Sequence, residues 1–177
     1  MMKPKVWLFA LICVVFAGIG VYTGMHAASS ATSLAATAPA VSNLFKQAMP
    51  DANGNAQSFA QWQGKPMVVN FWATWCGPCV EEMPALSALQ TEVVPKHVQI
   101  VGIGIDSPSN IKEFAAKYKI TYPLFVAGMS GTELSKQFGN RTGALPYTVL
   151  VSADGQIIKT YIGKLKMDEL RRDIAAL

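Results

Sequence analysis

The sequence predicts a single α/β domain whose sheet has parallel strands at its centre. Residues 67–72 and 98–105 are apolar runs rich in β-branched side chains, and apolar residues at helical spacing follow each run. Strands that alternate with helices pair in parallel. Two further apolar runs, 147–151 and 156–161, flank a glycine-containing turn and predict an antiparallel hairpin. The chain of 177 residues, 51% of them hydrophobic, is long enough for one such domain with its own core.

The N-terminus has the pattern of an export segment. Lys3 and Lys5 precede an uncharged run, 6–25, which as a helix would be roughly 30 Å long, the thickness of a bilayer core. We therefore expect residues 1–25 to form a signal anchor, with a cleaved signal peptide as the alternative because small residues suited to cleavage occur at 36–40. The lysines would stay in the cytoplasm. This predicts a single-pass protein of the bacterial inner membrane with its domain in the periplasm, or a soluble periplasmic protein after cleavage.

The segment after the export pattern is predicted to be a tether. Residues 26–40 are small and polar, and we interpret them as a flexible linker ahead of a domain that covers residues 41–177. Runs 44–48 and 56–59 flank an Asn-Gly pair, which favours the positive backbone angles of a hairpin turn. A short helical turn is expected at 59–63. The domain should therefore begin with a β-hairpin.

The remaining elements follow from apolar spacing and from turn residues. In chain order we expect a helix at 77–94, a strand at 98–105, a helix that carries Ile111 and Phe114, a strand at 121–126, a helix at 131–138 and a last helix at 167–176. Ser107 or Ser109 can cap the second of these helices.

The charge balance argues against nucleic acid as a partner. The formal net charge is +4, from 15 Lys and Arg against 11 Asp and Glu, and Lys3 and Lys5 of the export segment account for part of the excess. The remaining basic residues form only short clusters near the C-terminus, which are typical of a solvated helix end. We therefore expect no nucleic-acid binding.

The three cysteines divide into one in the apolar N-terminal segment, Cys13, and a pair, Cys76 and Cys79, at the predicted start of a helix. A thiol attacks as its thiolate, and the free N–H groups of a first helical turn stabilise that negative sulfur. Cys76 is therefore our candidate nucleophile, and Cys79, one turn on, our candidate resolving thiol. We expect no cofactor beyond the redox-active disulfide Cys76–Cys79.

Two structural interpretations of the pair compete with redox chemistry. A disulfide that closes so short a loop stabilises a fold by only about 2 kcal/mol in the loop-entropy model, so a purely structural role would contribute little to stability. A closed zinc site needs four ligands, and beyond the pair the chain offers only His26 and His97 as nitrogen donors. The spacing therefore favours a redox pair, with no bound metal.

The run Asn70-Phe71-Trp72-Ala73-Thr74-Trp75-Cys76-Gly77-Pro78-Cys79, with Glu82 and Pro84 after it, resembles the active site of the membrane-tethered thioredoxin-like reductases of the TlpA/ResA/CcmG group. The resemblance implies a three-layer thioredoxin-like fold with a central mixed β-sheet. It also implies an N-terminal β-hairpin and a central insertion between the second core helix and the last hairpin, preceded by one N-terminal transmembrane or signal helix.

A proline near the C-terminal hairpin gains a role from this resemblance. Only about 5% of X-Pro bonds are cis in folded proteins, so the sequence by itself leaves Pro146 trans. Thioredoxin-like proteins place a cis-proline opposite their cysteine pair, which implies that position for Pro146. We then expect the backbone of Leu145 to pair with an extended substrate segment, as in strand addition.

The resemblance also indicates which acidic residue exchanges protons with the cysteine pair. True thioredoxins have a buried aspartate where this chain has Asn70, and an asparagine cannot relay a proton by ionising. Glu82 occupies the position of a functional glutamate in the resembled group and lies one turn after Cys79, so we expect it to exchange protons with the resolving thiol. A surface glutamate is the alternative. The expected substrate-contacting residues beside the pair are Trp75, Gly77, Pro78 and Leu145.

The dipeptide between the cysteines favours a reductant. Gly77 and Pro78 carry no charge or histidine to stabilise the thiolate strongly, as in thioredoxin, whose potential is roughly 150 mV, or about 7 kcal/mol, more reducing than that of the oxidant DsbA. By resemblance, the expected partners are a membrane thiol-electron donor protein and a disulfide-bearing protein, either apocytochrome c or a copper-site maturation protein.

Two other functions use the same pair. A copper-binding assembly chaperone would carry Cu(I) on the two thiolates, but the sequence near them offers no evident third soft ligand. A thioredoxin-fold peroxidase is the other alternative, although the pattern Pro-x-x-x-Thr-x-x-Cys expected for peroxiredoxins is absent. The sequence therefore favours a protein-disulfide reductase.

Overall fold

The computed structural model describes residues 39–177. The predicted anchor at 1–25, with Cys13, and residues 26–38 of the predicted linker lie outside the described residues. Among the residues that are described, no helix is both long and apolar enough to cross a membrane.

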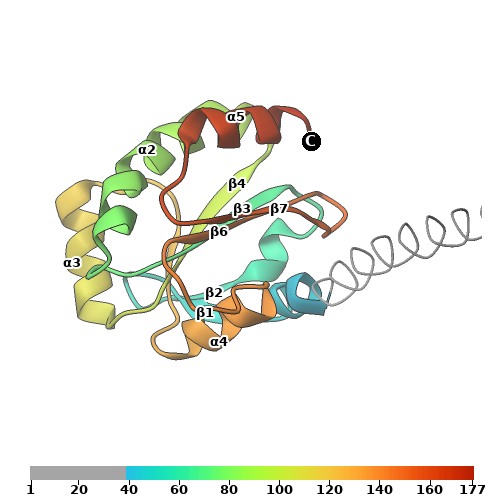
Figure 1. The fold of residues 1–177 in the computed structure, drawn as a ribbon. Helices are drawn as coiled ribbons and strands as arrows, with labels where there is room; N and C mark the ends of the chain where they lie inside the picture. Colours follow the sequence, from blue (N-terminus) through green and yellow to red (C-terminus); the bar gives the residue numbers. More distant parts are fainter. Residues whose placement is uncertain (1–38) are drawn as a thin grey trace, which may run out of the picture. The chain divides into compact units, whose positions relative to one another are not determined.

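The described chain forms one five-stranded sheet with helices on both faces and a separate two-stranded hairpin (Figure 1). The elements are β1 (Ala48–Pro50), β2 (Ala56–Ser58), η1 (Phe59–Trp62), β3 (Met67–Trp72), α2 (Gly77–Val93), η2 (Val94–Lys96), β4 (Gln99–Gly104), α3 (Pro108–Tyr118), β5 (Leu124–Val126), α4 (Ser130–Gln137), β6 (Tyr147–Val151), β7 (Ile157–Ile162) and α5 (Met167–Ala175).

The sheet is mixed, with strand order β5-β4-β3-β6-β7. β3 pairs in parallel with β4 and β4 in parallel with β5, whereas β6 is antiparallel to both β3 and β7. The predicted parallel centre and C-terminal hairpin are therefore confirmed. The strand predicted at 121–126 is shorter than expected and covers only Leu124–Val126. Pro123 has no N–H to continue the ladder, although its carbonyl still accepts a hydrogen bond from Gly102.

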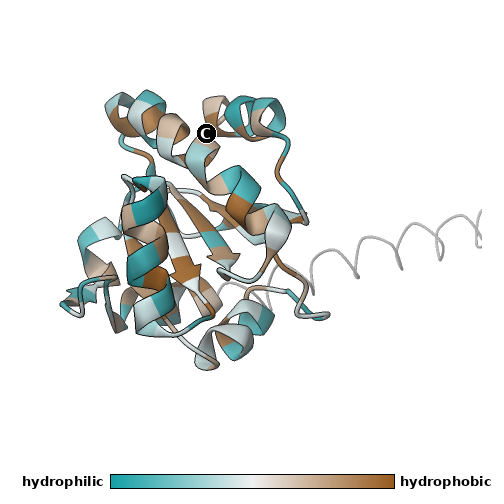
Figure 2. Ribbon diagram, turned by 90° about the vertical axis from the view of Figure 1, so that its left-hand side faces the viewer, coloured by the Kyte–Doolittle hydropathy of each residue, from teal (hydrophilic) through white to brown (hydrophobic). Residues whose placement is uncertain are grey.

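Successive side chains of β3 point to opposite faces of the sheet, so the core has two layers. Val68 and Trp72 pack under α2, α3 and α5, whereas Val69 and Phe71 pack on the other face against η1, α4 and the helix of residues 39–45. Figure 2 shows apolar strands at the centre and helices with one apolar and one hydrophilic side. The three-layer arrangement expected from the resemblance is thus present in the described part of the chain.

The start of the domain differs from the prediction. The hairpin β1–β2 forms, with Met49 opposite Gln57, but the run 44–48 is not a strand because residues 39–45 are helical. Ala40, Val41 and Leu44 recur at helical spacing and are buried against the sheet, so packing outweighs the strand pattern. The predicted linker overlaps this helix at Pro39 and Ala40, which belong to the domain.

The segment expected as an insertion forms β5 and α4. β5 adds an edge strand beside β4, and α4 covers the face of the sheet opposite α2. Gly131, in the first turn of α4, allows the helix to approach the sheet closely, because a Cβ there would lie 2.8 Å from Cγ1 of Ile105. The end of α4 packs Leu134 and Phe138 into the core.

Candidate active site

The two cysteines lie where β3 gives way to α2. Cys76 is the N-cap of α2, and its sulfur accepts a hydrogen bond from the backbone N–H of Cys79 at 3.3 Å. The two sulfurs are joined in a disulfide of 2.04 Å. Cys76 is 7% exposed and Cys79 is fully buried, so Cys76 is the more accessible cysteine of the two. This order agrees with Cys76 as nucleophile and Cys79 as resolving thiol.

The residues predicted beside the pair form its surface. Gly77 and Pro78 are the first two residues of α2 and are both exposed. Proline is favoured there because the N–H that it lacks would have no helical partner. Trp75, immediately before Cys76, is 69% exposed. These three residues thus form exposed surface next to Cys76 in the chain.

A carboxylate fixes the loop that precedes Cys76. Asp106, at the end of β4, accepts hydrogen bonds from the backbone N–H of Thr74 at 3.1 Å and from the Thr74 hydroxyl. The same carboxylate accepts from the N–H of Ser107 and the side-chain amide of Asn110, each at 2.7 Å. Asp106 thus ties the active-site loop to the start of α3. Sequence reasoning did not identify it, because the two segments are far apart in the chain.

Leu145 and Pro146 lie at the same end of the sheet as the pair. Tyr147 pairs with Phe71 in the β3–β6 ladder, which places Pro146 level with the last residues of β3. The Leu145–Pro146 peptide bond is cis, as the resemblance implies. The Leu145 side chain packs against the apolar cluster that contains both cysteines. Among the described residues, no backbone hydrogen bond involves the N–H or C=O of Leu145, so both groups are free to pair with another chain.

Glu82 is not a surface residue. Its side chain is 2% exposed and lies on the face of α2 that packs against the sheet, one turn after Cys79. Oε2 accepts a hydrogen bond from the backbone N–H of Leu165 at 2.8 Å, and Oε1 accepts from Nδ2 of Asn70 at 2.9 Å. Asn70 also donates to the hydroxyl of Thr148 at 2.9 Å. The surface alternative for Glu82 is therefore wrong.

Burial raises the pKa of Glu82 from 4.5 to about 7. The hydrogen bonds from Leu165 and Asn70 and the positive charge of Lys164 act in the opposite direction and only partly offset the burial. A carboxyl with a pKa near 7 is present in both protonation states at neutral pH. It can therefore both accept and donate a proton in that range.

Three further polar groups are buried in the core near the site. Among the described residues, Oδ1 of Asn70, Nε1 of Trp72 and the hydroxyl of Tyr122 are buried without a hydrogen-bond partner. Burial, and then the charge of Glu82, raise the pKa of Tyr122 well above its usual value. Gly102 makes room for these rings, since a Cβ there would lie 3.1 Å from Nε1 of Trp72 and 3.2 Å from Cε2 of Tyr122. No sequence signal identified Tyr122.

The raised pKa of Glu82 predicts a pH-dependent stability. Between about pH 4.5 and pH 7 the unfolded chain has lost the Glu82 proton while the folded protein retains it, so the folded state binds more protons and its stability falls as the pH rises. The raised pKa corresponds to a loss of about 3 kcal/mol across this range. Urea unfolding of the disulfide form at pH 5 and pH 8 measures it. Glu82→Gln should remove most of this loss, and an equal loss in both proteins would contradict the assignment.

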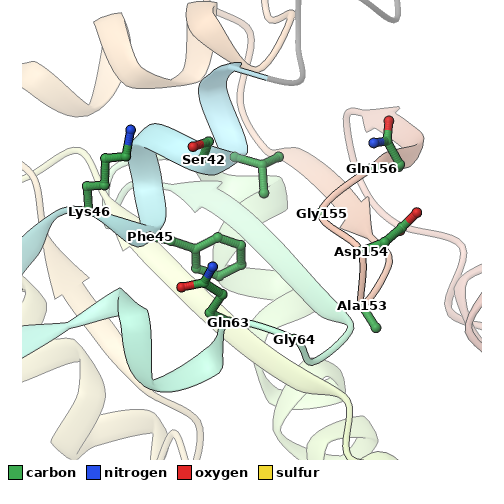
Figure 3. Close-up of a pocket in the computed structure, with 10 residues that line it drawn as sticks. Ser42, Phe45, Lys46, Gln63, Gly64, Ala153, Asp154, Gly155 and Gln156 are labelled. Carbon is green, nitrogen blue, oxygen red and sulfur yellow. The ribbon is translucent and has the colours of Figure 1, made fainter.

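One pocket lies away from the two cysteines. It has a volume of about 430 Å³ and lies between the helix of residues 39–45, Gln63 and Gly64 after η1, and the β6–β7 turn at Asp154 (Figure 3). The Phe45 ring points into it. None of its lining residues belongs to the site built around Cys76. Within residues 39–177, no cluster of three or more His, Cys, Asp or Glu side chains is placed to hold a metal ion.

Comparison with known proteins identifies the family. The Redoxin family profile matches residues 34–175. The thiol-disulfide oxidoreductase ResA of Geobacillus kaustophilus is 25% identical over 173 residues, which cover 95% of this chain and 92% of that protein. ResA of Bacillus thuringiensis subsp. konkukian is 31% identical over 121 residues, which cover 68% of each chain.

Solved structures have the same fold. A thioredoxin family thiol:disulfide interchange protein of Chlorobium tepidum has a TM-score of 0.64 and 27% identity, covering 73% of this chain and 91% of that one. A secreted Mycobacterium tuberculosis disulfide oxidoreductase homologous to Escherichia coli DsbE has a TM-score of 0.65 and 24% identity, covering 76% of this chain and 98% of that one. The chain therefore belongs to the Redoxin family, as a thiol-disulfide oxidoreductase with a thioredoxin-like fold.

Proposed function

We propose that the protein is an exported reductant of protein disulfides. The observation that carries the proposal is the combination of a more accessible cysteine, Cys76, with a buried one, Cys79, and a buried acid, Glu82. Glu82 lies one helical turn after Cys79 in α2. An outer nucleophile and an inner resolving thiol with its own proton acceptor are the parts that two successive exchange steps require.

The reaction transfers two electrons from the reduced pair to the substrate. The Cys76 thiolate attacks one sulfur of the substrate disulfide, which breaks that bond, forms a mixed disulfide and releases the other sulfur as a thiolate. Cys79 then loses its proton to Glu82 and attacks the Cys76 sulfur, which closes the Cys76–Cys79 disulfide and releases the second substrate thiolate. The protein pair is oxidised and the substrate disulfide is reduced to two thiols.

The direction follows from what lies between the cysteines. Gly77 and Pro78 bring no charged group to the Cys76 sulfur, so the disulfide form is not strongly destabilised relative to the dithiol. A strong oxidant such as DsbA has a stabilised reduced form. This chain therefore suits the donation of electrons to a substrate.

The substrate would be held by its backbone. The free N–H and C=O of Leu145 can pair with an extended segment on one side of the target cysteine, with Pro146 at the start of β6 behind it. Backbone pairing reads little sequence, so it suits a range of disulfide-bearing proteins. Apocytochrome c and a copper-site maturation protein are the candidates that the resemblance to the TlpA/ResA/CcmG group suggests.

The predicted N-terminal span supports a location outside the cytoplasm. With residues 1–25 as an anchor and Lys3 and Lys5 inside, the domain would lie in the periplasm on the inner membrane, or free in the periplasm after cleavage. Disulfides form in that compartment, and a reductant there needs a supply of electrons. A membrane thiol-electron donor protein would restore the dithiol.

Reduction of insulin tests the activity. The dithiol form should cleave the insulin interchain disulfides and precipitate the B chain with dithiothreitol as electron source, at a rate well above that of dithiothreitol alone. No acceleration would contradict the proposal. The copper-carrier alternative is decided in parallel by titrating the dithiol form with Cu(I), since tight stoichiometric binding without insulin reduction would favour it.

A further inference from the structure

A groove is lined by three segments: Trp75 before the cysteine pair, residues 105–108 after β4, and residues 126–129 before α4. It has a volume of about 530 Å³, and both Trp75 and Met129 line it. Ile105, Val126 and Ala127 supply further apolar lining. Trp75 is the residue before Cys76, so the groove shares one lining residue with the surface beside the redox pair.

Two of the side chains that line the groove, Met129 and Trp75, are unusually exposed. Met129 is 83% exposed and Trp75 is 69% exposed, and they are the two most exposed large apolar side chains among the described residues. Side chains this exposed contribute little burial energy to folding, and contiguous exposed apolar patches commonly mark binding sites. Methionine is flexible and polarizable, so it adapts to apolar partners of different shapes.

Hydrogen bonds hold two of the segments that line the groove. Hydrogen bonds from Thr74 to Asp106 fix the loop that carries Trp75. In the segment that carries Met129, the Ser130 hydroxyl donates to the carbonyl of Ala127 at 2.6 Å, and the backbone N–H of Gly131 donates to the carbonyl of Gly128 at 3.1 Å. These bonds define the turn that presents Met129. The groove is therefore formed before any partner binds, which lowers the entropy lost on binding.

The groove offers no positive charge to a ligand. Asp106 is the one ionisable residue among those that line it. Burial acts to raise its pKa, but the hydrogen bonds from Thr74, Ser107 and Asn110 outweigh burial, so its pKa lies below the usual value and the carboxylate stays charged. An acidic segment would be repelled, and the carboxylate oxygens already accept several hydrogen bonds. The remaining lining favours apolar side chains.

We propose that this groove binds a large apolar side chain next to the target cysteine of the substrate, and that Met129 determines this preference. The proposal rests on the proposed function, because the ligand is an extended segment of a disulfide-bearing protein whose sulfur is attacked by Cys76. Leu145 would hold the backbone of the segment, and the groove would select its side chain. The substrate class is thus a disulfide whose cysteine has an aliphatic or aromatic neighbour.

Two symmetric peptide disulfides test the preference. One has leucine on both sides of its cysteine and the other has serine, and both have blocked ends. Second-order rate constants with the dithiol protein are divided by those with dithiothreitol, which removes differences in intrinsic reactivity. Wild-type protein should prefer the leucine peptide about tenfold, as expected for one apolar side chain in a groove. Met129→Ser should lower the ratio to less than about threefold, and Met129→Leu should restore it.

Ile158 supplies the matched control. It is 52% exposed on β7, outside the residues that line the groove, so Ile158→Ser should keep the tenfold ratio. An unchanged ratio in Met129→Ser, or a ratio near one in wild type, would overturn the groove assignment. Hydroxyethyl disulfide has no side chain to place in the groove, so its reduction tests the proposed function separately from the groove. If wild type reduces it but shows no peptide preference, only the groove fails, whereas no reduction of any of these disulfides overturns the proposed function.

Discussion

Replacing Cys79 by serine is expected to trap substrate proteins on the enzyme as mixed disulfides. Cys79 is fully buried and Cys76 is the outer sulfur, so the first exchange step remains possible while the second loses its nucleophile. Replacing Cys76 by serine should lower disulfide reduction by several orders of magnitude, because a hydroxyl is not ionised at neutral pH as a thiolate is. Non-reducing gels and mass spectrometry measure the trapped species.

The double variant, Cys76→Ser with Cys79→Ser, is the control for nonspecific association. Bands that persist in it are not mixed disulfides at this site. The assignment of roles would be reversed if Cys76→Ser trapped substrate through Cys79 and Cys79→Ser did not. The trapped proteins also report which substrates the chain meets in the cell, and apocytochrome c or a copper-site maturation protein is expected among them.

Replacing Glu82 by glutamine should slow the second exchange step by about 100-fold at pH 7, the usual contribution of a general base. In wild type, the rate of this step should rise with pH through about 7 as Glu82 becomes able to accept the Cys79 proton. Glutamine cannot ionise, so the rate in the variant should no longer rise through pH 7 and should increase only at higher pH, as the thiol itself ionises.

The step is measured with 5,5′-dithiobis(2-nitrobenzoate). Attack by Cys76 releases one coloured thiolate, and attack by Cys79 on the resulting mixed disulfide releases the second. Glu81→Gln is the matched control, because Glu81 is the adjacent residue but is exposed and forms a salt bridge with Lys164. An unchanged second phase in Glu82→Gln, or an equal change in Glu81→Gln, would show that Glu82 is not the proton acceptor.

Much of the fold was predictable because its signals are local. The apolar runs that form β3 and β4 can be recognised within six residues, and Ser107 caps α3 as one of two predicted candidates. The helix of residues 39–45 was missed because its few apolar residues also suit a strand. The choice between the two depends on burial against η1 and the sheet, which the local pattern does not contain.

The candidate site was predictable where its residues are neighbours in sequence. The redox role of Cys76 and Cys79 could be predicted from their spacing and from the helix that follows Cys76. The environment of Glu82 depends on contacts with distant segments, since Thr148 binds Asn70 across 78 positions and Leu165 binds Glu82 across 83. No local pattern encodes those contacts. The resemblance to a known group indicated Glu82, but its burial and its raised pKa emerge only from the folded chain.

The reduction potential of the Cys76–Cys79 pair tests the central claim most directly. Equilibration of the purified protein with glutathione buffers of graded ratio, followed by trapping of free thiols, gives the value. The account predicts a reducing potential close to that of thioredoxin, about −270 mV. A potential near about −120 mV, that of DsbA, would make the protein an oxidant and contradict the account.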